Sequence, residues 1–196
     1  MYYDNEYTAM KLRRWETYLN NYRLPAWDDI PDFGLYMEQV IDLLKTHLDY
    51  LPPELKEDEF ITSSTINNYV RIKVMPEPIK KRYYRVHIAY LIIILTLKQS
   101  LSIAMIRSLL PKDLPKESVE KAYTMYVARH RATAEYFTQQ VALAAAPILG
   151  SESDSDMAVN DTEDLIAAAA ITAGFSRLLA TKLLLLKDGK SSQSET

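Results

Sequence analysis

The feature that most limits the fold of this chain is the run from Val86 to Leu97, in which nearly every residue is apolar. At about a dozen residues it is well short of the roughly 20 that a helix needs to cross a bilayer. A helix that is apolar around most of its circumference has to be buried by neighbouring elements. The run therefore predicts a central helix, extending to about Gln99, around which a soluble domain packs.

The rest of the chain favours an all-α fold. Only 4 of the 196 residues are glycine, so a sheet with many tight hairpins is not expected. Apolar residues recur at helical spacing over most of the sequence. The expected helices are Tyr7–Tyr22, Phe33–Tyr50 after an Asp32 N-cap, a short helix after a Ser102 N-cap, Ser118–Ala146 with Ser118 as the cap, and a last helix opened by Asp161 or Thr162.

A short helix after Thr62 has clear start and stop signals. Thr62 is a favourable N-cap, and Ile61 and Ile66 occupy the two positions of a hydrophobic staple. Prolines after Met75 require the helix to end near Ile72. At 100° per residue, the inner face is expected to hold Ile66, Tyr69 and Val70, and the outer face Ser64, Asn67, Asn68 and Arg71.

The segment MPEPIKKRYYR, residues 75–85, is called the wing below. Two prolines, four bases and adjacent aromatic residues indicate an extended turn or a short two-stranded ribbon. Because neighbouring residues of a strand face opposite ways, one of Tyr83 and Tyr84 is expected in the core.

The charge of the chain is concentrated in one window. Residues 61–112 hold nine bases and one acid, a formal charge of +8, while the remainder holds 14 bases and 25 acids, a formal charge of −11. A basic module inside an acidic protein is typical of nucleic-acid binding. The alternative is a solvated face that happens to contain few acids.

A capped helix with a polar outer face, followed by a basic wing and two packed helices, is the order of a winged helix-turn-helix. Asn pairs with adenine and Arg with guanine in the major groove, while Lys and Tyr hold phosphates. The alternative for Asn67 and Asn68 is a polar surface pair near a helix end. The predicted DNA-binding residues are Ser64, Thr65, Asn67, Asn68, Arg71, Lys73, Lys80, Lys81, Arg82, Tyr84 and Arg85.

The strings LYMEQVI, INNYV and KKRYYR, within residues 24–110, resemble the bacterial family known as domain of unknown function 1836. That family more distantly resembles the DNA-binding half of mercury-resistance-type (MerR) regulators, in which a recognition helix holds a Thr or Ser and a Tyr, and a wing holds an Arg and a Tyr. Thr65, Tyr69, Arg82 and Tyr84 occupy comparable places. The resemblance implies a MerR-like winged helix-turn-helix core in a transcriptional regulator, with repressor as the expected sign. The chain departs from those regulators in lacking a long C-terminal coiled coil.

The expected organisation has four parts. They are an N-terminal helix (1–23), the winged helix-turn-helix domain (24–112), two C-terminal helices that dimerise or bind an effector (113–187), and a disordered tail (188–196). Leu165–Leu186 is long enough to cross a membrane, but Arg177 and Lys182 interrupt it at about 2.5–3.5 kcal/mol each. We therefore expect a cytoplasmic homodimer that buries this helix. Its expected partner is double-stranded DNA, and it is not expected to bind a membrane. The absence of cysteine fits a reducing compartment.

An enzyme is not expected. His47, His87 and His130 lie far apart with no metal-ligand spacing, and phosphate-binding glycine loops are missing. His87 is expected to be a core or cap histidine. No metal and no cofactor are predicted. The alternative function is a helical adaptor whose basic face binds an acidic protein.

Overall fold

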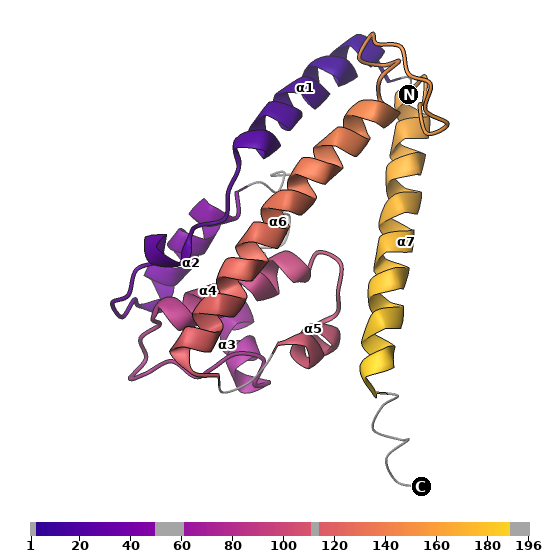
Figure 1. Cartoon of the computed structure of the whole chain (residues 1–196). Helices are drawn as coiled ribbons and strands as arrows, with labels where there is room; N and C mark the ends of the chain where they lie inside the picture. Colours follow the sequence, from indigo (N-terminus) through magenta and orange to yellow (C-terminus); the bar gives the residue numbers. More distant parts are fainter. Residues whose placement is uncertain (1–2, 50–60, 111–113, 189–196) are drawn as a thin grey trace, which may run out of the picture. The chain divides into compact units, whose positions relative to one another are not determined.

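The computed structural model describes residues 3–49, 61–110 and 114–188, and this part of the chain contains seven α-helices, one 3-10 helix and no strand (Figure 1). The all-α class is confirmed. The elements are α1 (Asn5–Asn21), η1 (Trp27–Asp29), α2 (Met37–His47), α3 (Ser63–Arg71), α4 (Arg85–Leu97), α5 (Ile103–Leu109), α6 (Lys116–Ala144) and α7 (Thr162–Asp188). The chain divides into two compact units, Arg23–Arg129 and Met1–Tyr22 with His130–Thr196.

α4 is the centre of the unit Arg23–Arg129. Every side chain from Ile88 to Thr96 is buried, as the apolar run predicts. α2 packs against α3 and α4, and α5 packs against α4. The helix ends at Leu97, two residues before the expected Gln99, and Lys98 is its C-cap. α2 and α5 therefore rest on the buried helix α4, and α3 packs on α2.

The first half of α6 completes this core. The Tyr123 hydroxyl donates to the Pro25 carbonyl oxygen at 2.8 Å, and its ring lies 6.0 Å from the ring of Trp27. The hydroxyls of Tyr126 and Thr96 are 2.5 Å apart. Trp27 is buried, as expected. These contacts join α6 to the loop before α2 and to the end of α4.

The predicted caps at Thr62 and Ser102 are confirmed, since their hydroxyls accept from the Thr65 and Met105 amides. Two other predicted starts are wrong. Asp32 does not cap α2; its carboxylate instead pairs with the Lys116 ammonium at 2.8 Å, which lowers the pKa of Asp32.

α2 begins at Met37 because the residues before it are used elsewhere. The backbone N–H and C=O of Leu35 pair with those of Tyr83, at 2.8 and 2.9 Å, so the chain is extended at this point. The Tyr36 amide then donates to the Gln39 side chain at 2.9 Å. Phe33, expected inside the helix, is exposed.

α6 also begins before its predicted cap. Lys116 follows Pro115, whose carbonyl oxygen accepts from the amides of Ser118 and Val119. Ser118 thus lies inside the first turn. At the other end the helix stops at Ala144, close to the expected Ala146.

The second unit contains α1, the rest of α6 and α7. The rings of Trp15 and Phe137 meet edge to face at 5.7 Å, and the Arg13 guanidinium donates to the Leu149 carbonyl oxygen at 2.7 Å. The Thr162 hydroxyl donates to that of Thr8 at 3.0 Å. Asp161 accepts from the Asp164 amide and so opens α7, as predicted.

Beyond its first turn, α7 is covered by little of its own chain. Apolar side chains on all sides of it are exposed, including Ile171, Phe175, Leu179 and Leu183. Among the described residues it is the helix long and apolar enough to span a membrane by length and composition. The burial predicted for Leu165–Leu186 is therefore not provided by the described residues of its own unit. The predicted tail lies outside the described residues except for Asp188, where α7 ends.

Candidate nucleic-acid interface

The outer face of α3 is polar, as the sequence predicts. Ile66 and Tyr69 are 0% and 2% exposed on the inner side, whereas Ser64, Asn67 and Arg71 are exposed. The cap at Thr62 fixes the first turn, and its hydroxyl also lies 3.0 Å from that of Thr65. The outer face of the helix therefore presents hydroxyl, amide and guanidinium groups, while its N-cap and its buried inner face hold the helix in place.

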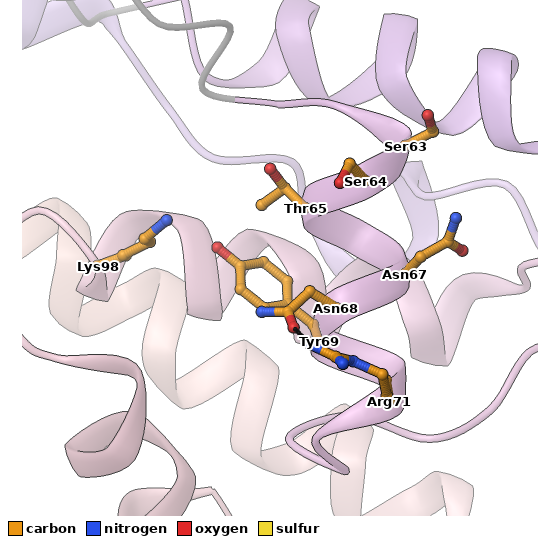
Figure 2. A pocket seen from close by; sticks show the side chains of 8 residues that line it. All are labelled: Ser63, Ser64, Thr65, Asn67, Asn68, Tyr69, Arg71 and Lys98. Carbon is orange, nitrogen blue, oxygen red and sulfur yellow. Dashed lines mark hydrogen bonds between the residues drawn. The ribbon is translucent and has the colours of Figure 1, made fainter.

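Asn68 and Arg71 form a hydrogen-bonded pair on the outer side of α3. The Arg71 Nη2 donates to the Asn68 Oδ1 at 2.7 Å (Figure 2). This bond leaves the Asn68 amide NH₂ and the remaining guanidinium donors available for a partner. It also holds two flexible side chains in one arrangement before any ligand arrives, which reduces the entropy cost of binding.

Lys80 and Lys81 form the tip of the wing. Ile79 and Arg82 exchange both backbone hydrogen bonds, at 3.0 and 2.9 Å, around these two residues. Both lysines have left-handed backbones, with φ of 48° and 63°, as a two-residue type I′ turn requires. Lys73, which follows α3, is left-handed too, at 56°. Such conformations are costly for residues with a side chain and gather at functional sites.

Arg82 holds the wing to the segment before α2. Its guanidinium lies 4.4 Å from the centre of the Tyr36 ring and donates to the Tyr36 hydroxyl at 2.7 Å and the Gly34 carbonyl oxygen at 3.3 Å. Of the neighbouring tyrosines, Tyr83 is buried and Tyr84 is half-buried, as the alternation predicts.

Arg85 has its own internal partners. Its Nε donates to the Ile30 carbonyl oxygen at 2.7 Å, and its Nη1 pairs with the Asp28 carboxylate at 3.1 Å. The guanidinium also lies 5.7 Å from the Trp27 ring. Arg82 and Arg85, both predicted to contact DNA, therefore position the wing and the start of α4 through these bonds.

His87 is a cap histidine in the core, as expected. Its Nδ1 accepts from the Tyr84 amide at 3.0 Å and its Nε2 lies 2.9 Å from the Glu77 carbonyl oxygen. The ring is 3% exposed and contacts the ring of Tyr83.

An open hollow of about 700 Å³ lies beside α3. Figure 2 shows the Tyr69 ring extending from α3 toward Lys98, whose Nζ is 5.8 Å from the centre of that ring. Lys98 was not among the predicted site residues. The sequence indicates only that Lys98 belongs to the basic window of residues 61–112. Packing of α4 against its neighbours, which the sequence pattern does not reveal, places Lys98 beside the hollow. The residues lining the hollow are Ser63, Ser64, Thr65, Asn67, Asn68, Tyr69, Arg71 and Lys98.

The described residues contain no cluster of side chains that could bind a metal ion. Nowhere among residues 3–49, 61–110 and 114–188 do three His, Asp or Glu side chains come together as metal ligands would. The site is therefore one of hydrogen-bond donors and positive charge.

Comparison with known proteins gives one match. The family described as Domain of unknown function (DUF1836) matches residues 25–126, which include α2 to α5, the wing and the first part of α6. No curated protein and no solved structure matches the chain.

Proposed function

We propose that this chain, a member of the family described as Domain of unknown function (DUF1836), binds duplex DNA as a transcriptional regulator, with repressor as the expected sign. The observation that carries the proposal is the exposed polar face of α3, with its preformed Asn68–Arg71 pair. α3 enters the major groove, where amide and guanidinium groups distinguish base pairs by their hydrogen-bonding edges.

The wing supplies affinity. Lys80 and Lys81 are exposed at the tip of a tight turn and have left-handed backbones. Lysines placed this way neutralise phosphates and release counterions irrespective of sequence. Arg82 and Arg85 hold the wing in place and keep donors for the same backbone.

The arrangement is proposed to be a MerR-like winged helix-turn-helix. α2 packs on both α3 and α4, and the wing lies between α3 and the start of α4 in the chain. In such a module the first helix crosses the DNA backbone while the second reads bases.

The protein is proposed to act as a homodimer through α7, in the cytoplasm. A helix that is apolar on all sides is stable in water only when another surface covers it, and the described residues of its own unit leave it exposed. A second copy of α7 supplies a surface of the same chemistry. A symmetric dimer also matches two half-sites of a palindromic operator.

In vitro selection of duplexes by the full chain, followed by salt titration of the selected site, tests the proposed function. We expect a defined motif and a log K against log salt slope of several units. Arg71→Ala should remove about 1–3 kcal/mol of preference at one or two base pairs, whereas Lys81→Ala should weaken all duplexes alike.

Lys121→Ala is the matched control, because Lys121 is exposed on α6 within the same compact unit. It should leave both the motif and the slope unchanged. Weak binding without a motif would contradict DNA reading and favour an adaptor that binds an acidic protein. A motif that survives the Arg71 change intact would show that α3 does not read bases.

A further inference from the structure

We propose that the hollow beside α3 holds one phosphate group of the DNA backbone, bound by the Lys98 ammonium and the Tyr69 hydroxyl. This inference rests on the proposed function and adds to it a phosphate site outside the wing. It is carried by an unpartnered buried hydroxyl, by the charge around it and by the form of the hollow.

The Tyr69 hydroxyl is the buried side-chain donor that lacks a hydrogen-bond partner in the described part of the chain. The side chain is 2% exposed and lines the hollow. Buried polar groups in folded proteins nearly always have a partner, so an orphaned hydroxyl facing a cavity indicates a ligand. Burial raises the pKa of Tyr69 to about 12, so the group keeps its proton at neutral pH and acts as a donor.

The charge of the hollow selects an anion. Lys98 and Arg71 are its charged members, and none of its eight lining residues is acidic. Lys98 caps α4 and is exposed, so its ammonium can move onto a phosphate oxygen that lies beside the Tyr69 hydroxyl. A compact ammonium charge on a flexible stem, next to a neutral donor, is a common arrangement for a phosphate.

The open form of the hollow favours a polymer as its ligand. A small molecule is usually held in a closed, mostly apolar pocket that buries most of its surface. This hollow is open to solvent and lined mainly by polar side chains from α3, including Asn67 and Asn68. A phosphodiester of a duplex whose bases contact the same helix fits such a surface.

Four variants test the site by duplex binding, salt titration and thermal unfolding. Lys98→Met should lower the salt slope by about 0.9. Tyr69→Phe should weaken duplex binding about tenfold, with an unchanged Tm or one raised by about 2–4 °C, because it removes a donor that is unsatisfied in the free protein.

The controls remove the same groups elsewhere. Lys121→Met should leave the slope unchanged. Tyr123→Phe should lower Tm without a specific loss of binding, since its hydroxyl is already bonded to Pro25. A Tyr69→Phe variant with lower Tm and normal affinity would overturn the site, as would an unchanged slope in Lys98→Met.

Failure of the proposed function and failure of the phosphate site give different experimental results. If the unmodified chain binds no duplex, both proposals fall together. If it binds duplex but the two hollow variants bind equally well, only the phosphate site is overturned. Inorganic phosphate, titrated while NMR signals of Lys98 and Tyr69 are followed, separates the sources: saturation by free phosphate below millimolar concentration would overturn the backbone assignment.

Discussion

The Nε2 of His87 lies 2.9 Å from the carbonyl oxygen of Glu77, ten residues earlier in the chain. Because Nδ1 accepts from the Tyr84 amide, Nε2 carries the ring proton and donates it to Glu77. The imidazole therefore connects the start of the wing to the first turn of α4.

His87→Leu should loosen the wing. Leucine has no donor in place of Nε2, so the Glu77 carbonyl loses this partner, at a cost of about 1–3 kcal/mol. Hydrogen exchange measured by mass spectrometry should become faster in peptides containing Ile79 and Arg82, whose amides close the wing turn. His47→Leu in α2 is the control and should not change wing exchange. Unchanged protection in the His87 variant would show that the wing does not depend on this bond.

Gly34→Ala should displace Arg82. A Cβ at Gly34 lies 2.8 Å from the Cδ and 2.9 Å from the Cβ of Arg82, distances that no packed structure tolerates. Relief requires Arg82 to leave its place on the Tyr36 ring, so we expect a loss of about 1–3 kcal/mol of stability by denaturant unfolding. The wing lysines should also lose their fixed position.

Gly174→Ala is the matched control for that change. A Cβ at Gly174 contacts nothing within 4 Å, and the residue lies in the middle of α7. Alanine there should stabilise the helix by about 0.5–1 kcal/mol. Equal effects of the two substitutions would contradict the tight contact at Gly34.

The double change Leu179→Lys and Leu183→Lys should convert a dimer into a monomer. These leucines are exposed within one chain, and charges at both positions cannot be buried by a second copy without a large desolvation cost. Light scattering at micromolar concentration measures the change. Glu163→Lys, at the polar start of α7, should leave the mass unchanged. An unmodified chain that is monomeric in buffer, or that floats with phospholipid vesicles, would contradict dimerisation through α7.

Stability should fall as the pH drops below neutrality, in part through His130. Burial lowers the pKa of His130 in the folded state, so the unfolded chain binds more protons as the pH falls through the ordinary histidine value of 6.5. His130→Asn should therefore show a smaller decrease in Tm between about pH 7.5 and 5.5 than the unmodified chain. Parallel curves would show that His130 contributes nothing to the pH dependence.

Local signals were the part of the fold that could be predicted. Three features depend on neighbours within a few residues: the caps at Thr62 and Ser102, the polar outer face of α3, and the burial of Tyr83 beside a half-buried Tyr84. The central place of α4 follows equally directly from its composition.

Features set by distant residues could not be predicted. Asp32 would cap a helix if left alone, but Lys116, 84 residues later, provides its partner, while pairing of Leu35 with Tyr83 delays α2. Arg82 and Arg85 likewise find partners 46 to 57 residues earlier. Packing of the helices brings Lys98 and the residues of α3 to the same hollow, and helical periodicity in the sequence does not predict this packing.

α4 fixes the spacing between the two proposed phosphate contacts. Its first turn is bound to the wing through His87, and its cap, Lys98, lines the hollow. At 1.5 Å and 100° per residue, the insertion or loss of one residue in α4 would shift and rotate Lys98 relative to the wing by that step. This helix therefore holds the two proposed contacts at a fixed distance, and among related chains the number of residues between the wing and Lys98 should be constant.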